Sequence, residues 1–167
     1  MDPRFDVPLY TIQEAARHVD MAPSTIRYWV YKKRIVRYVP PRHQGEATLP
    51  FISLAEIQFI RGLRKSQLSL RAVTEGIEAL REDLGENYLV RDRLAHDGTD
   101  ILVRLAESDV EWTRARDAQA GIPGAVALGL QTITFDEAGQ PERVTLTEYE
   151  GADVIIDPRF AFGQPIV

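Results

Sequence analysis

Residues 10–31, with the sequence YTIQEAARHVDMAPSTIRYWVY, constrain the fold of this chain more than any other segment. Apolar residues recur there at three- and four-residue steps, which places them on one face of a helix. They are Ile12, Ala15, Ala16 and Val19. After a short break a second helix is expected to open. Two short helices joined by a tight turn are typical of a helix-turn-helix, whose second helix enters the DNA major groove. An ordinary helical hairpin packed for stability has the same pattern.

The second helix is predicted to begin at Pro23, because the N–H that proline lacks is not needed in a first helical turn. Ser24 and Thr25 are expected to cap the exposed backbone donors at that end. Basic residues are concentrated at the end of this helix and beyond it. They are Lys32, Lys33, Arg34, Arg37 and Arg42. A basic cluster at this position favours contacts with DNA phosphates, which supply most sequence-independent affinity.

Two β-prone runs follow, around residues 36–39 and 49–52, with a polar connector of Pro40, Pro41 and Gly45 between them. This arrangement predicts a β-hairpin wing. Ser53, with Glu56 three positions later, predicts a capping box at the start of the next helix. The apolar stripe expected for that helix is Leu54, Ile57, Ile60 and Leu63, continued by Leu68.

This ordered set resembles the N-terminal winged-helix domain of the MerR family, over residues 10–82. The similar segments are Y-T-I-Q-E-A-A-R, S-T-I-R-Y-W and F-I-S-L-A-E-I-Q-F-I-R-G-L-R-K. The resemblance implies that four residues of the second helix face DNA, namely Ser24, Thr25, Arg27 and Tyr28. It also implies that Arg42 and His43 of the wing reach the flanking backbone. Ile26 is expected in the core, and Trp29 either in the core or partly exposed.

The two halves of the chain carry opposite net charges. The whole chain has 20 basic and 25 acidic side chains, a net charge of −5. Residues 1–81 hold 13 basic and 8 acidic side chains, a net of +5, whereas residues 82–167 hold 7 and 17, a net of −10. This division favours DNA binding by the first half only. The acidic half either meets a basic partner or is simply a solvated surface.

The composition predicts a cytoplasmic protein that contains no disulfide. The chain has no cysteine, which fits a reducing compartment. Its first ten residues lack the features of a signal peptide, and its apolar runs are far shorter than the ~20 residues of a membrane helix. We therefore expect no membrane partner.

Residues 69–84 predict a further helix, capped by Ser69 and stopped by Gly85. Its expected apolar stripe is Leu70, Val73, Ile77, Leu80 and Leu84. In MerR proteins the corresponding region leads into a long dimerisation helix, but here the periodicity ends at Leu84. This departure puts a coiled-coil dimer in question.

Beyond Tyr88 the pattern predicts a small β-hairpin-rich module. Residues 89–94 and 101–105 flank an Asp97-Gly98 turn, and residues 128–135 and 143–147 flank a second turn. Residues 108–120 between them are expected to be a helix or an irregular linker. The expected fold class is therefore α+β, with a MerR-like winged helix in residues 1–84, the β module in 85–150 and an extended tail in 151–167.

The tail, DVIIDPRFAFGQPIV, resembles the opening of a bacterial domain with the pattern I-x-x-D-P-x-x-x-x-G-x-P-[IV]-[IV]. A MerR-like helix-turn-helix, a small β module and this domain occur together in VapB-type antitoxins, which the chain resembles nearly end to end. We expect it to be cut off after the first strand of that last domain. The resemblance implies a homodimer that represses its own operon by binding operator DNA and that neutralises a PIN-like ribonuclease toxin.

The toxin-binding residues that this resemblance suggests lie late in the chain. Arg143 or Arg159 would enter the acidic site of the toxin, with Phe160 and Phe162 beside Arg159. The alternative for Arg159 is a solvent-exposed charge next to Asp157. A different hypothesis for the whole chain is a MerR-like regulator, or a winged-helix adaptor for protein interactions, that has no toxin.

An enzymatic function is not expected. His18, His43 and His96 stand singly, without a partner at metal-ligand spacing, and no nucleophile motif or glycine-rich phosphate loop occurs. Asp97 and Asp100 could imitate a carboxylate pair, but an Asp-Gly hairpin turn is the simpler explanation. We expect neither a metal nor a cofactor.

Overall fold

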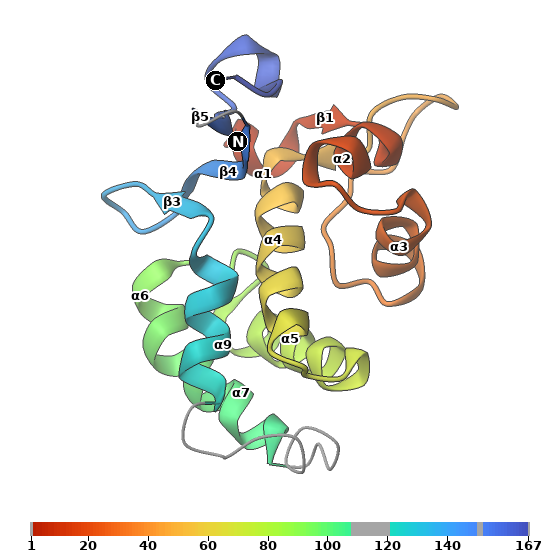
Figure 1. Ribbon diagram of the computed structural model, residues 1–167. Coiled ribbons are helices and arrows are strands. Elements are labelled where there is room, and N and C mark those ends of the chain that lie inside the picture. Colours follow the sequence, from red (N-terminus) through yellow and green to blue (C-terminus); the bar gives the residue numbers. More distant parts are fainter. Residues whose placement is uncertain (1, 108–120, 150–151, 167) are drawn as a thin grey trace. The chain divides into compact units, whose positions relative to one another are not determined.

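The computed structural model describes residues 2–107, 121–149 and 152–166 of the chain, and these residues have an α+β fold (Figure 1). They form two compact units. The first unit comprises Met1–Ile57, Thr132–Thr134 and Pro141–Val167, and the second comprises Gln58–Gln131 and Phe135–Gln140. No helix in the described part of the chain is long and apolar enough to cross a membrane.

The first unit contains the predicted pair of short helices, α2 (Ile12–Val19) and α3 (Pro23–Arg27), and α3 continues into a wider π-helical turn, η1 (Tyr28–Lys32). The Thr11 hydroxyl caps α2 by accepting a hydrogen bond from the Glu14 N–H at 3.1 Å. Asp20 ends α2 in the left-handed conformation, with φ of 54°. The predicted two-helix segment is confirmed.

The predicted capping of the second helix by Ser24 and Thr25 is wrong. The N-cap position is Ala22, which provides no side-chain hydrogen bond. Since Pro23 occupies the first helical position, Ser24 and Thr25 already lie within the first turn of α3. The hydroxyl of Ser24 is therefore left on the exposed side of the helix.

The predicted wing hairpin is also not formed. Residues 36–39 make no strand, and a single backbone hydrogen bond, from the Val39 N–H to the Thr48 carbonyl at 2.7 Å, joins the two sides of this loop. The strand β2 (Leu49–Pro50) pairs instead with β1 (Pro8–Tyr10), which follows the short helix α1 (Pro3–Asp6). The prolines of the loop lack the N–H groups that a hairpin ladder needs.

The helix α4 (Phe51–Lys65) begins two residues before Ser53, so the predicted capping box is wrong as well. The Ser53 hydroxyl donates to the carbonyl of Arg37, and a Glu56 carboxylate oxygen accepts from the N–H of Arg37 at 2.8 Å. These two side chains thus fix the loop that follows η1. The predicted apolar stripe of α4 is buried throughout, as are Ile26 and Trp29.

The C-terminal sheet has the strand order β3 (Ile133–Phe135), β4 (Pro141–Tyr149) and β5 (Ala152–Ile156). β4 and β5 are antiparallel, with Val144 opposite Ile156. The turn of the predicted second hairpin lies between β3 and β4 as expected. Its first arm was placed too early, because residues 128–130 are the end of the helix α9 (Gly121–Leu130).

The second unit is helical where the sequence predicted the first hairpin. The helix α5 (Leu70–Leu84) is capped by Ser69 as predicted, and the Ser69 hydroxyl accepts from the Ala72 N–H at 3.1 Å. Three consecutive helical segments then follow: α6 (Arg91–Arg93), the π-helical turn η2 (Leu94–Gly98) and α7 (Thr99–Ala106). Segment 85–150 is therefore not β-rich throughout. The prediction for residues 108–120 lies outside the described residues.

Gly98 lies in the helical turn η2 and not in the predicted hairpin turn. A Cβ at Gly98 would lie 2.7 Å from a methyl carbon of Leu94 and 3.2 Å from one of Leu80, so this glycine permits close helix packing. Gly62 of α4 likewise permits close packing, since a Cβ there would lie 2.3 Å from the Cα of Gly129 in α9.

The predicted domain boundaries after residues 84 and 150 stay predictions.

Candidate nucleic-acid interface

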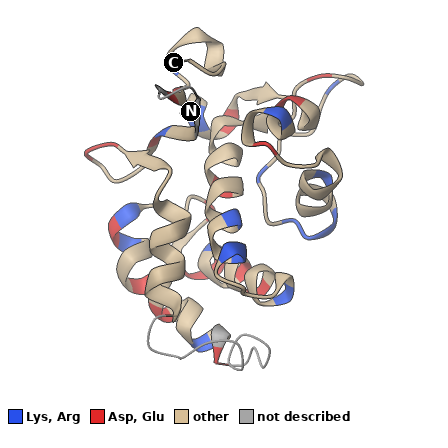
Figure 2. Ribbon diagram, viewed as in Figure 1, with Lys and Arg blue, Asp and Glu red and all other residues tan. Residues whose placement is uncertain are grey.

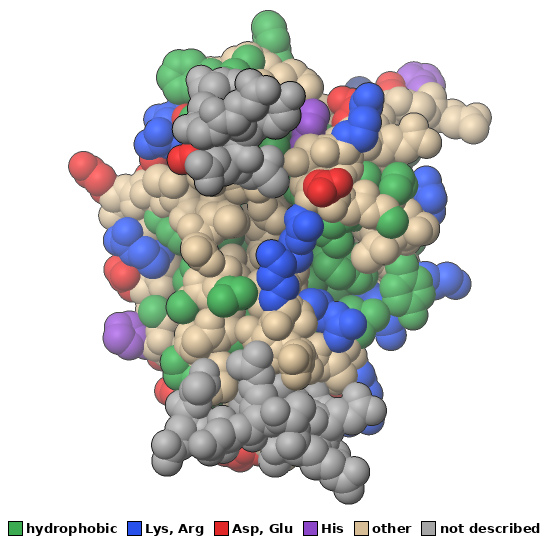
Figure 3. Space-filling view, viewed as in Figure 1, with side chains coloured by type: hydrophobic (Ala, Val, Ile, Leu, Met, Phe, Trp, Pro, Cys, Tyr) green, Lys and Arg blue, Asp and Glu red, His purple; other side chains and the backbone are tan. Residues whose placement is uncertain are grey.

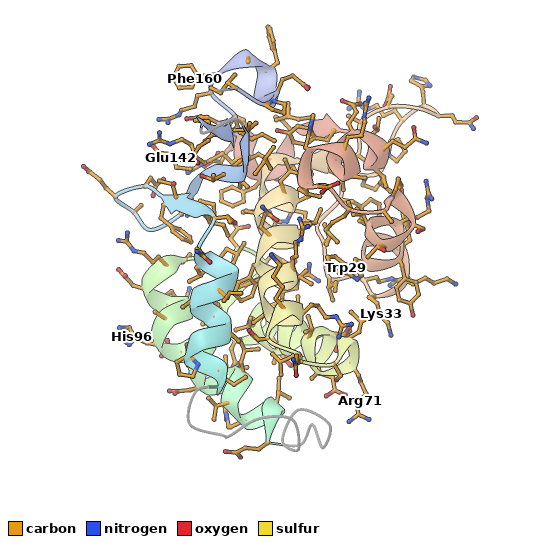
Figure 4. The ribbon with its side chains drawn as sticks, viewed as in Figure 1. Trp29, Lys33, Arg71, His96, Glu142 and Phe160 are labelled. Carbon is orange, nitrogen blue, oxygen red and sulfur yellow. The ribbon has the colours of Figure 1, made fainter. Side chains whose placement is uncertain are left out.

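The second helix of the helix-turn-helix has one buried and one exposed face. Ile26, Trp29 and Val30 are buried, and Figure 4 shows Trp29 turned inward from this helix. The opposite face consists of residues at steps of three and four, which is the spacing of a helical stripe. These exposed residues are Ser24, Arg27, Tyr28, Tyr31 and Lys32. They line a shallow hollow with a volume of about 310 Å³.

The cations of this face form no ion pair with the residues that the structure describes. Arg27 and Lys32 are exposed, and neither makes an ion pair with another described residue. The Lys33 ammonium lies 5.6 Å from the ring centroid of Tyr28, as a cation–π contact. Figure 2 shows Lys and Arg side by side along α3 and the loop after it. A face of this kind can contact phosphates without first breaking a salt bridge.

The loop of residues 36–48 places two further predicted residues at the surface. Arg42 and His43 are exposed at its outer part, where Gly45 turns the chain with φ of 88°. The Glu46 carboxylate accepts a hydrogen bond from the Arg42 backbone N–H at 3.0 Å, and the Glu46 N–H donates to the carbonyl of His43 at 3.3 Å. Hence this tip is held by hydrogen bonds within the loop rather than by a hairpin ladder.

Four of the eight predicted DNA-binding residues therefore gather on one helix face: Ser24, Arg27, Tyr28 and Lys32. Of the remaining four, Thr25 and Lys33 are half-buried, and Arg42 and His43 lie on the loop. Their roles in DNA binding stay predictions. The sequence analysis missed Tyr31 and Tyr38, whose rings meet edge to face with centroids 5.4 Å apart. The helical period from Arg27 would have found Tyr31, but no local pattern pairs it with Tyr38.

The C-terminal segment forms a second polar cluster in the first unit. The guanidinium of Arg159 donates to both carboxylate oxygens of Asp157, at 2.9 and 2.6 Å, and also lies 3.1 Å from Glu142. Asp157 is buried, and the hydrogen bonds from Arg159 lower the pKa of its carboxyl group although burial opposes them. Arg143 lies 3.9 Å from the same carboxylate. Both predicted toxin-binding arginines are thus engaged within the chain.

Two aromatic side chains stand out next to this cluster. Phe160 is 56% exposed and Phe162 is 91% exposed, the most exposed large apolar side chain among the described residues. Phe162 belongs to the short turn η3 (Ala161–Gly163) and has φ of 53°, in the left-handed region that residues other than glycine seldom adopt. Figure 4 shows Phe160 at the outer end of this segment, above Glu142.

The turn η3 is anchored to β1 inside the first unit. The Tyr10 hydroxyl donates a hydrogen bond to the Gly163 carbonyl at 2.6 Å, and both groups are buried. Burial also raises the pKa of Tyr10, with a smaller contribution from Glu14. A Cβ at Gly163 would lie 2.6 Å from that hydroxyl oxygen, so only glycine fits there. The phenylalanines are consequently presented by a fixed turn.

Comparisons with known proteins agree with this geometry. Residues 8–77 match a family model described as "Putative DNA-binding HTH domain", and this stretch includes α2 and α3. Over 98% of its length the chain is 28% identical to a protein of Mycobacterium tuberculosis (strain ATCC 25618 / H37Rv) named "Putative antitoxin VapB45", and the alignment covers 78% of that relative. The crystal structure of Rv2018 from Mycobacterium tuberculosis superimposes with a TM-score of 0.77 at 28% identity. That match covers 98% of this chain and 81% of the solved one.

Proposed function

We propose that this chain is an antitoxin of a type II, VapBC-like system. It binds operator DNA through α3, η1 and the loop of residues 36–48, and it represses its own operon as a homodimer. The observation that carries the proposal is its likeness, over nearly the whole chain, to a protein named as an antitoxin. A helix-turn-helix alone is used by many unrelated regulators, so the likeness of the other half matters more for the antitoxin role.

The DNA-binding part is supported by the exposed face of the second helix. It offers a guanidinium, an ammonium group, a hydroxyl and two phenol rings at helical spacing, and none of its cations is paired within the described chain. Arginine at such a position recognises guanine by two hydrogen bonds, while lysines contact phosphates. We assign Arg27 to base recognition, and Lys32, Lys33 and Arg42 to the backbone.

The toxin-binding part is supported by the C-terminal segment. Phe160 and Phe162 are exposed on a turn that Tyr10 anchors, which is the form of an aromatic anchor in a protein interface. The Arg159 guanidinium carbon lies 5.6 Å from the centroid of the Phe160 ring, and Arg159 forms a salt bridge with Asp157. To enter an acidic toxin site, Arg159 would exchange one set of carboxylates for another. In this proposal the phenylalanines supply most of the affinity and the PIN-like ribonuclease is the partner.

DNA binding is tested by fluorescence anisotropy with the duplex from upstream of the chain's own gene and with a scrambled duplex, at two salt concentrations. We expect salt-sensitive binding that prefers the native duplex. Equal binding of both duplexes, or none, would favour an adaptor in which the helix-turn-helix is a docking surface.

Toxin binding is tested by co-expression with the product of a PIN-like reading frame, if one is found beside the gene of this chain. We expect a stable complex and loss of ribonuclease activity. The variant Phe162→Ser should weaken the complex, while Leu128→Ser, at another exposed apolar side chain, serves as the matched control. A MerR-like regulator without a toxin predicts sequence-specific DNA binding and no complex.

A further inference from the structure

The hollow on the exposed face of α3 and η1 is apolar although cations surround it. Its walls are the rings of Tyr28 and Tyr31, which are 44% and 43% exposed. Ser24, Arg27 and Lys32 complete the lining. On the α3 side of the molecule in Figure 3, hydrophobic side chains lie directly among Lys and Arg side chains. Phenol hydroxyls can donate to phosphates, but such contacts do not need the apolar surface that two rings present in this hollow.

Both rings are held in place by neighbours. The Tyr31 ring rests against the edge of Tyr38, from the following loop, at 5.4 Å between centroids. The Tyr28 ring has the Lys33 ammonium 5.6 Å from its centroid. The hollow is therefore shaped before any ligand arrives, which lowers the entropic cost of filling it.

The chemistry of the hollow selects its ligand. In the major groove, guanine, cytosine and adenine present only hydrogen-bond donors and acceptors, whereas thymine also presents a 5-methyl group. A phosphate would lose hydration against two aromatic rings, but a methyl group gains by leaving water. The cations at the rim would meanwhile meet the phosphates on either side.

We propose that this hollow binds the 5-methyl group of a thymine in the operator, which makes Tyr28 and Tyr31 determinants of sequence specificity. The inference rests on the proposed DNA-binding function and extends it. Arg27 recognises one base edge by hydrogen bonds, and the tyrosines recognise a neighbouring base by shape. Tyr38 acts as a positioning residue, because it touches Tyr31 and not the DNA base.

The test replaces each thymine of the bound duplex in turn by deoxyuridine, which removes only the methyl group. We expect one thymine in each half-site at which affinity falls by about fourfold, the equivalent of ~0.8 kcal/mol for a buried methyl-sized group. Replacing that base by 5-bromodeoxyuridine, whose bromine has the size of a methyl group, should restore the affinity. This series needs no protein variant.

Protein variants then locate the effect. Tyr31→Ser should bind the thymine and deoxyuridine duplexes equally, whereas Tyr31→Phe should keep the discrimination, because the hydroxyl is not required. Tight binding of the native duplex with no loss at any deoxyuridine would overturn the thymine site while leaving the DNA-binding function intact. The thymine site would also be overturned if Tyr31→Ser still distinguished the thymine duplex from the deoxyuridine duplex. Failure to bind any duplex would instead overturn the DNA-binding function itself.

Discussion

The helix-turn-helix and the C-terminal segment both expose arginine, but they hold it in opposite ways. Arg27 stands on the outer face of its helix without an ion pair to another described residue. Arg159 is bound by both oxygens of Asp157 and by Glu142. An unpaired cation contacts an anionic partner at the cost of its own ordering and desolvation, whereas a paired one must also give up its carboxylates. Position at the surface therefore does not by itself define a binding residue.

The largest effect is expected from Arg27→Ala. If Arg27 recognises a base edge, its loss should weaken binding of the upstream duplex by about 1–3 kcal/mol and leave the scrambled duplex nearly unchanged. Anisotropy titrations with both duplexes measure this difference. Arg159→Ala is the matched control from the other region and should change neither titration. An equal loss on both duplexes would assign Arg27 to the phosphates.

The next effect concerns the anchor of the C-terminal turn. Tyr10→Phe removes the hydroxyl that donates to the buried Gly163 carbonyl, and it leaves that acceptor without its hydrogen bond. We expect the free energy of unfolding to fall by roughly 1–2 kcal/mol in a urea titration. The variant Tyr38→Phe, which changes an exposed tyrosine, should lower the free energy of unfolding by much less. If the two variants were equally stable, the turn would not depend on this hydrogen bond.

The contrast between the two regions also explains how far the sequence could be interpreted. The helix-turn-helix was predictable because its signals are local: an apolar period and a proline at the first helical position. Four of the eight predicted DNA-binding residues lie on one stripe for the same reason, namely Ser24, Arg27, Tyr28 and Lys32. The tyrosine pair was not predictable in full, because Tyr38 reaches Tyr31 through the loop after η1.

In two of the wrong predictions, a contact outside the local motif had replaced the local use of a residue. Ser53 and Glu56 fit a capping box, but they bind the backbone of Arg37 instead. Asp97-Gly98 fits a hairpin turn, but Gly98 lets Leu94 and Leu80 pack closely within a helical segment. Neither Arg37 nor Leu80 is visible in a window of a few residues.

A smaller effect is expected from Lys33→Ala. Lys33 lies at the end of η1, where a phosphate contact is expected, so its loss should weaken binding of the upstream and scrambled duplexes alike. The slope of log affinity against log salt should become shallower by about 0.9, the contribution of one phosphate. Lys65→Ala, in α4, tests whether any lost lysine has this result. A loss confined to the upstream duplex would give Lys33 a role in base recognition.

The smallest effect is expected from acid, and it belongs to the C-terminal segment. Hydrogen bonds from Arg159 hold the pKa of the Asp157 carboxyl below its usual value, so the carboxylate stabilises the folded state above the pKa of the unfolded chain, about 4. This contribution is lost as the pH falls from there through the lower, folded pKa. It should be modest, because Arg159 is 56% exposed and solvent screens the pair.

The measurement is the free energy of unfolding between neutral pH and about pH 3, close to the ordinary pKa of aspartate, for the wild type and Arg159→Ala. The wild type should lose more stability across this range, because removing Arg159 returns the pKa of Asp157 toward its usual value. Added salt should narrow the difference. Arg27→Ala should follow the wild-type curve, since Arg27 has no carboxylate partner among the described residues. If the free energy of unfolding fell by the same amount with pH in all three proteins, the Arg159–Asp157 pair would make no pH-dependent contribution to stability. The two regions would then not differ in this respect.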